Sequence, residues 1–150
     1  MANPQTFLVP VTTHPASLEA IGIAAQMAKA HKGKVYAVHV IEVLRSLPLN
    51  ADMQAEARRG EQILRRGEEI AAHIGYPVRS ALVQAREAGQ AIVEEARDRG
   101  VDCIVLGVPF KRIIGTFHIG PTAEYVMKNA TCHVWLVRQG EEHRSPSEQE

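Results

Sequence analysis

Short apolar segments alternate along the chain with longer segments in which apolar residues recur every three or four positions. The short segments are rich in β-branched residues and predict strands at residues 7–11, 35–41, 78–83, 101–106 and 132–137. The periodic segments between them predict helices at residues 15–32, 52–74, 88–99 and 121–130. Regular alternation of strand and helix favours a parallel sheet, because right-handed crossovers place helices on its two faces. The pattern therefore predicts an α/β fold.

Several helix ends carry local signals. Thr12 and Thr13 offer a hydroxyl cap for the first helix, and Pro15 suits its first turn. Gly100 is expected to end the third helix in a left-handed conformation. The second helix has a different feature, because its arginines fall mostly outside the apolar stripe. A solvated face is favoured there over a ligand patch, at residues 58, 59, 65 and 66.

The predicted topology brings two loops to one crevice. In the order 3-2-1-4-5, a Rossmann-like arrangement of five parallel strands, the order reverses between the first and fourth strands. Ligands of such sheets bind beyond the carboxyl ends of the strands at that point. Residues 10–14 and the loop 107–120 are therefore expected to form the walls of the crevice.

The loop 107–120 has the outline of a phosphate cradle with two defects. Gly107 follows a strand and Gly120 opens a helix, an arrangement whose bare N–H groups attract anions. Phe110 adds a side chain where backbone would approach phosphate. Pro121 removes one of the free N–H groups at the helix start.

Other groups near this loop could still balance phosphate charge. Thr122 offers a hydroxyl, and Lys111 and Arg112 are adjacent cations within the loop, although such a pair is more often simply solvated. Two interpretations of Phe110 stay open. Its ring either stacks on a base or fills the pocket.

Composition narrows the classes of partner. The chain has 150 residues, enough for one domain that needs no disulfide or metal to hold its core. Its 17 basic and 17 acidic residues cancel, which argues against nucleic acid as a ligand. Cys103 and Cys132 lie in apolar segments and are expected to be buried thiols. Residues 139–150 are polar without periodicity, which predicts a disordered tail after a domain at 1–138.

Targeting, catalytic and metal-binding patterns are weak. No apolar stretch approaches the roughly 18 residues that span a bilayer, and no secretory layout opens the chain, so we expect a cytoplasmic protein. His14 and His118 are expected near the mouth of the crevice, with His39 one strand away, but no spacing among them supports a metal site. No pattern of a nucleophile paired with a base is evident in the sequence, so catalysis is not predicted.

Three segments resemble strands of the universal stress proteins. Leu8 to Val11 is similar to the family's first strand, Val38 to Ile41 to its second, and Cys132 to Arg138 to its fifth. The resemblance extends over residues 7–138. It implies the same five-stranded fold, similar to the adenine nucleotide alpha hydrolases.

The glycine loop resembles the family's nucleotide motif only in part. Members that bind ATP carry a Gly-x2-Gly-x9-Gly-Ser/Thr pattern, and Gly107 and Gly120 match its first and third glycines. Phe110 stands at the second glycine and Pro121 at the hydroxyl position. An aspartate that helps to hold the nucleoside is replaced by Thr12.

The resemblance implies a binding site for an adenine nucleotide. It puts Val40 beside the adenine and Pro10, Leu106 and Gly107 around the nucleoside. The full set of candidate binding residues is Pro10, Val11, Thr12, Val40, Leu106, Gly107, Phe110, Lys111, Arg112, Gly120, Pro121 and Thr122. Because phosphate donors are fewer, AMP or a cyclic adenine nucleotide is favoured over ATP, and magnesium is expected only with ATP.

Two classes of function remain open. The first is a nucleotide-responsive regulatory module that acts as a homodimer in a stress response. The second is an interaction protein that binds no nucleotide, or a cytosolic module of a membrane transporter. By resemblance, either form pairs through the strand at 132–137, where Trp135 either anchors the partner or packs in its own core.

Overall fold

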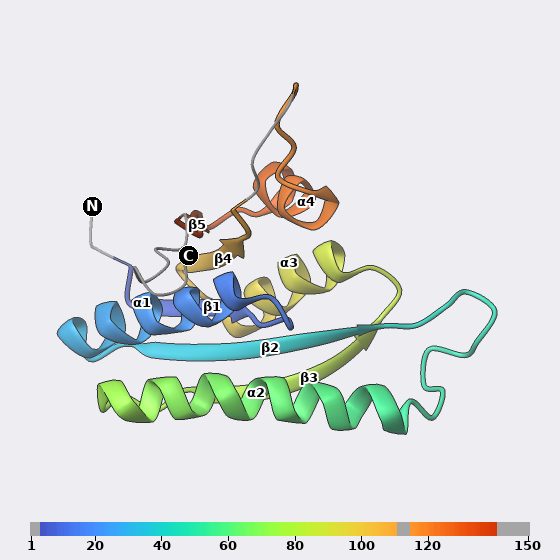
Figure 1. Ribbon diagram of the computed structural model, residues 1–150, viewed down its shortest axis with the longest axis horizontal. Coiled ribbons are helices and arrows are strands. Elements are labelled where there is room, and N and C mark those ends of the chain that lie inside the picture. Colours follow the sequence, from blue (N-terminus) through green and yellow to red (C-terminus); the bar gives the residue numbers. More distant parts are fainter. Residues whose placement is uncertain (1–3, 111–114, 141–150) are drawn as a thin grey trace, which may run out of the picture.

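A five-stranded parallel sheet forms the centre of the molecule, as the sequence predicts (Figure 1). The computed structural model describes residues 4–110 and 115–140. The strands are ordered β3-β2-β1-β4-β5, which confirms the predicted order. Along the chain the elements are β1 (Thr6–Pro10), α1 (Pro15–His31), β2 (Lys34–Glu42), α2 (Gln54–Ile74), β3 (Arg79–Ala85), α3 (Ala88–Arg99), β4 (Cys103–Val108), α4 (Pro121–Asn129) and β5 (His133–Arg138).

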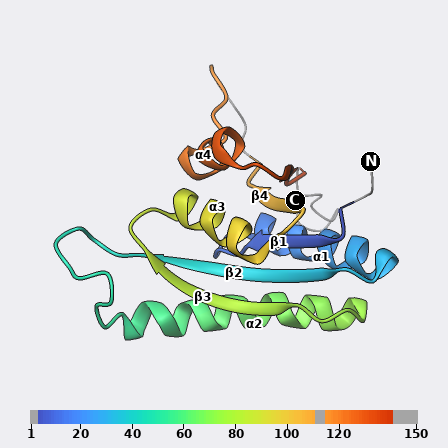
Figure 2. The same ribbon diagram turned by 180° about the vertical axis from the view of Figure 1, so that it is seen from behind.

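Helices cover both faces of the sheet. In both ribbon views α2 runs along β2 and β3, whereas α4 lies at the opposite end of the sheet, near β4 and β5 (Figures 1 and 2). Helices α1 and α2 share one apolar cluster with the sheet, and α3 and α4 share the other. No helix in the described ranges is both long enough and apolar enough to cross a membrane.

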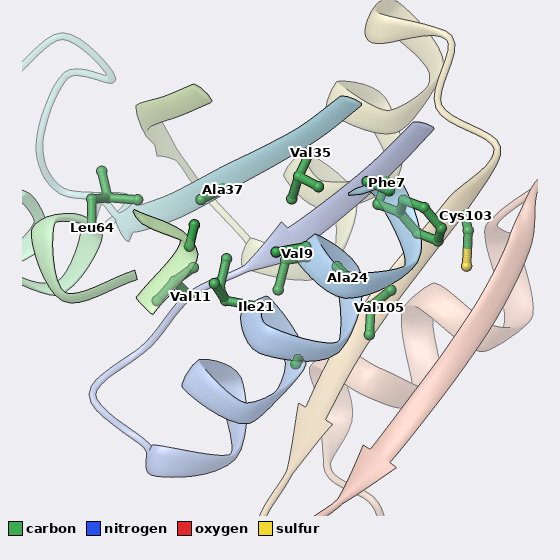
Figure 3. Packing of buried hydrophobic residues seen from close by; sticks show 14 residues of the cluster. Phe7, Val9, Val11, Ile21, Ala24, Val35, Ala37, Leu64, Cys103 and Val105 are labelled. Atoms are coloured by element: carbon green, nitrogen blue, oxygen red, sulfur yellow. The ribbon is translucent and has the colours of Figure 1, made fainter. Parts of the chain in front are cut away.

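Strand β1 is buried from Phe7 to Pro10 and divides the two clusters. Phe7 and Val9 belong to the cluster beneath α1, and Figure 3 shows Val9 near Ile21 and Phe7 nearer to Cys103. Leu8 points to the opposite cluster, and all three β1 residues are fully buried. A central parallel strand covered on both sides requires an uninterrupted apolar run, which is why this segment showed no polar alternation.

The prediction that a threonine caps α1 is wrong. The N-cap is His14, whose ring Nδ1 accepts a hydrogen bond from the Ala16 N–H at 3.2 Å. Thr12 instead accepts the His14 N–H on its hydroxyl, two residues ahead, and so closes the turn that precedes the helix. The Ser17 hydroxyl bonds the backbone of Thr12 and His14 and locks the same turn. Pro15 occupies the first turn as expected.

Strand β4 extends two residues further than the sequence predicted. Gly107 does not open a loop but lies within the strand, in register with Val137. A Cβ atom built at Gly107 would lie 2.3 Å from the carbonyl carbon and oxygen of Ala16. The glycine is therefore required by the approach of α1 to the sheet, irrespective of any ligand.

The remaining ends agree with the sequence to within two residues. Gly100 ends α3 with a φ of 62°, the expected left-handed conformation. After β5, the Gln139 N–H still donates to the Val108 carbonyl at 2.8 Å. Most of the polar tail, residues 141–150, lies outside the described residues.

Replacing Gly107 with alanine is expected to destabilise the fold by about 1–3 kcal/mol, because the new methyl group collides with the α1 backbone. Gly22→Ala is the matched control within α1. Its Cβ meets Ile70 and Ile74 at an ordinary 3.8 Å, so helix propensity should stabilise that variant by about 0.5–1 kcal/mol. Urea unfolding followed by circular dichroism measures both. Equal stability of the two variants would contradict the close approach.

The Cys103 thiol should make stability fall at alkaline pH. Burial, and secondarily the nearby Cys132 thiol, raise the pKa of Cys103 from 9.0 to about 12. Because the unfolded thiol ionises first, the stabilisation is complete below pH 9 and is lost as pH rises from 9 toward 12, by up to about 1.4 kcal/mol per pH unit. The difference in unfolding free energy between wild type and Cys103→Ala should therefore shrink between pH 8 and 10.5. A constant difference would show that this thiol does not carry the effect.

Candidate functional site

A cavity of about 300 Å³ lies at the carboxyl ends of β1, β2 and β4. The first residues of α3 and α4 and the end of the loop before α4 form its other walls. Its position between β1 and β4 is the point where the strand order reverses, as expected for a ligand site in an open parallel sheet.

Most of the candidate binding residues meet at this cavity. Those that line it come from the end of β1, from β2, from β4 and from the start of α4. They are Pro10, Val11, Thr12, Val40, Leu106, Gly107, Gly120, Pro121 and Thr122.

Phe110 does not line the cavity. Its ring lies under the guanidinium group of Arg138 on β5, with 5.1 Å between Cζ and the ring centroid. A cation–π contact of this kind holds the ring toward β5 rather than over a bound base. Lys111 and Arg112, the two candidate cations, lie outside the described residues.

The cavity also has walls that the candidate set missed. On β2, Val38 and Glu42 flank Val40 at a spacing of two, so the three side chains face the same side of the sheet. Alternation along the strand could have identified them. On α3, Ala88 and Ile92 are one helical turn apart and line the cavity together. Their apolar surfaces and the Glu42 carboxylate give the cavity an apolar floor with an acidic rim.

The start of α4 offers hydrogen-bond donors to this cavity. Gly120 is the N-cap with a φ of 95°, a conformation that favours glycine, and it provides no side-chain cap. The first helical bond runs from the Glu124 N–H to the Gly120 carbonyl at 3.0 Å. Since Pro121 has no N–H, the amides of Thr122 and Ala123 are the donors left at this helix end.

Main-chain groups of β2 are also left without a strand partner here. The β1 ladder ends at the pairing of Pro10 with Val38, and the Val11 N–H donates to the Val38 carbonyl at 2.8 Å. The Val11 carbonyl lies 2.7 Å from Nδ1 of His39. The N–H and carbonyl of Val40 therefore face the cavity beyond the end of β1.

The histidines do not form a metal centre in the described ranges. His14 caps α1, and His39 supports the end of β1 through the Val11 carbonyl. His118 is exposed. Within residues 4–110 and 115–140, no three histidine, cysteine, aspartate or glutamate side chains are close enough to hold a metal ion.

The two thiols lie away from the cavity. Cys103 is buried at the start of β4, and Cys132 is half-buried just before β5, and both are free. Burial raises the pKa of each thiol. Both therefore remain protonated at neutral pH. The expected burial is confirmed for Cys103, whereas Cys132 is only half-buried.

Comparison with known proteins identifies relatives over the described domain. The sequence model of the Universal stress protein family matches residues 4–138. Universal stress protein MJ0531 from Methanocaldococcus jannaschii is 29% identical over 138 residues, which cover 88% of this chain and 81% of the relative.

Solved structures share the fold. The universal stress protein from Archaeoglobus fulgidus in complex with dAMP has a TM-score of 0.71 at 17% identity, over 91% of this chain and 99% of that one. A universal stress protein in complex with cAMP has a TM-score of 0.67 at 21% identity, over 93% of this chain and all of that one.

Proposed function

The chain belongs to the universal stress protein family, and we propose that it binds an adenine nucleotide in the cavity between β1 and β4. The observation that carries the proposal is the convergence of an apolar pocket, a free main-chain pair on β2 and a helix N-terminus at one place. These three features suit a base, its hydrogen-bonding edge and a phosphate respectively. Relatives of the same fold have been solved with dAMP and with cAMP.

The base is proposed to lie against the apolar walls. Val38, Ile92 and Leu106 provide flat apolar surface, and the free N–H and carbonyl of Val40 form an adjacent donor and acceptor. The amine and ring nitrogen at one edge of adenine require that combination of partners.

The ribose is proposed to lie near Glu42. This carboxylate lines the cavity from the strand next to Thr12, the residue that stands where ATP-binding relatives are expected to have aspartate. An ionised carboxylate accepts hydrogen bonds from two ribose hydroxyls. Glu42 therefore replaces the missing acceptor from a different strand.

The phosphate is proposed to lie at the start of α4. The amides of Thr122 and Ala123, the Thr122 hydroxyl and the helix dipole favour one phosphate group there. A cavity of about 300 Å³ is at the small end of ligand sites, and the Glu42 carboxylate repels added negative charge. AMP or a cyclic adenine nucleotide is therefore preferred to ATP.

Calorimetric titration tests the preference. AMP is expected to bind at least several-fold more tightly than ATP with magnesium, because only one phosphate meets donors at α4. Tighter binding of ATP would contradict the preference. Absence of binding by adenosine, AMP, cAMP and ATP alike would overturn the proposed function and favour a protein that acts through its surfaces alone.

Two substitutions separate the parts of the ligand. Thr122→Ala should weaken AMP by about tenfold and leave adenosine unchanged, because the hydroxyl bonds only the charged phosphate. Glu42→Gln should weaken adenosine through the lost ribose contact and weaken AMP less, because the substitution also removes the repulsion between the carboxylate and the phosphate. The same titration measures the affinities of both ligands for each variant. Any other pattern of losses would contradict the proposed orientation of the nucleotide.

The nucleotide-bound form is proposed to act as a homodimer paired through β5. Strand β5 pairs with β4 on one side only among the described residues, and its Leu136 is 38% exposed. Trp135 packs inward, with its ring 5.6 Å from that of Phe7, so Leu136 is the better candidate to contact a partner. An open apolar edge strand is a typical pairing surface.

Leu136→Lys should therefore convert a dimer into a monomer, because a buried cation at a paired edge is strongly unfavourable. Leu44→Lys is the matched control, since Leu44 is 70% exposed and belongs to the loop between β2 and α2. Figure 1 shows that this loop lies away from β5. Size-exclusion chromatography with light scattering at micromolar concentration reads out both. A wild-type monomer, or a dimer that survives in Leu136→Lys, would rule out this interface.

A further inference from the structure

A second and larger hollow lies next to the nucleotide cavity, on the other side of Thr12. It has a volume of about 440 Å³ and is formed by the β1–α1 turn, by Leu18 of α1 and by residues of α2. Thr12 is the one residue that lines both this hollow and the cavity between β1 and β4. The two hollows are therefore neighbours with different walls.

The walls of this hollow are dominated by hydrogen-bond donors. Guanidinium groups come from α2, and hydroxyl and amide groups come from the turn and from the same helix. The polar lining residues that matter are Thr12, Thr13, Arg59, Gln62, Arg65 and Arg66. One carboxylate, Glu69, faces these three cations, so the hollow carries net positive charge.

These donors are available to a ligand. Arg59 forms a long ion pair of 3.8 Å with Glu56, both partners being well exposed, and such pairs contribute little. Arg65 and Arg66 form no ion pair within the part of the chain that the structure describes. The Thr12 hydroxyl accepts the His14 N–H, which leaves its own O–H free to donate.

Apolar surface continues from the donors along the seam between α1 and α2. Leu18 and Ile63 lie at the bottom of the hollow. A shallow depression of about 400 Å³ shares Leu18 with it and extends to Ile70 and Ile74. A ligand seated here would meet charge at one end and apolar side chains at the other.

We propose that this groove binds a small organic phosphate, with its phosphate group at Arg59 and Arg66 and its apolar part over Leu18. Guanidinium groups bind phosphate oxygens through paired hydrogen bonds, and the adjacent threonine hydroxyls are further donors. Such a set of donors favours an anionic ligand over a cation. The site is separate from the nucleotide cavity and does not depend on it. The sequence had favoured a solvated face for these arginines, because helical periodicity does not reveal that the β1–α1 turn lies opposite them.

Phenyl phosphate serves as the probe, because it combines one phosphate with an apolar ring and lacks adenine and ribose. Titration followed by amide chemical shifts is expected to perturb residues of the β1–α1 turn and of α2 around Arg59 and Arg66. Arg59→Gln and Arg66→Gln should each weaken binding by about five- to tenfold, the range for one charged hydrogen-bonding partner of an exposed phosphate. Inorganic phosphate should bind more weakly than phenyl phosphate, because it leaves Leu18 uncovered.

Arg58→Gln is the matched control. Arg58 is exposed on the same helix, carries the same charge and does not line the groove. It should change the affinity by less than about twofold, since distant exposed charges are screened. All three positions are exposed, and unchanged circular dichroism spectra would exclude misfolding as the cause of any loss.

Four results would overturn the site. Equal weakening by Arg58→Gln and Arg59→Gln would indicate diffuse surface charge. Shifts centred on Thr122 and Ala123 would place the phosphate at α4 instead. Binding that fails to saturate at about 10 mM phenyl phosphate would mean that the groove has no useful affinity. Adenosine, which lacks phosphate, should not compete in any of these titrations, and competition by it would likewise assign the probe to the nucleotide cavity.

Discussion

The approach of α1 to β4 at Gly107 determines how the rest of this structure is arranged. Because Ala16 lies directly against that glycine, the turn that precedes α1 is held at the carboxyl end of the sheet. The Ser17 hydroxyl and the His14 ring then fix the turn from within. Thr12 lines both the cavity between β1 and β4 and the hollow beside α2, so a single packing contact positions walls of both hollows.

The strands and helices could be predicted from the sequence because short local patterns, such as an apolar segment or a helix-ending glycine, reflect where each segment lies in the fold. A fully buried central strand such as β1 needs a continuous apolar segment, and Gly100 and Pro15 mark helix ends by their own backbone preferences. Alternation alone did not determine the strand order, which came from the resemblance to the universal stress proteins and is confirmed by the structure. Together, the apolar segments, the helix-end signals and the resemblance left few alternative folds for residues 7–138.

Residues of the site could be predicted only where the strand order alone places them at the carboxyl ends of β1 and β4. Most candidate residues do meet at the cavity, whereas Phe110 turns toward Arg138, a contact between the loop and β5 that no local pattern encodes. His14 is the cap in place of a threonine because the Thr12 hydroxyl accepts the His14 N–H, and the Ala16 N–H at the helix start donates to the His14 ring. Glu42 is not among the candidate binding residues, because its place in the cavity wall depends on the neighbouring strand ending first.

Gly107 also limits what sequence motifs can reveal about function. A glycine at this position is needed for helix packing whether or not a phosphate is ever bound, so its presence carries no information about nucleotide binding. Gly120 is similar, since its positive φ is a requirement of the backbone. The informative positions are those whose side chains line the cavity without a packing role in the fold, among them Glu42 and Thr122. Classifying relatives into binders and non-binders therefore requires side chains from separate strands and helices rather than the glycine spacing.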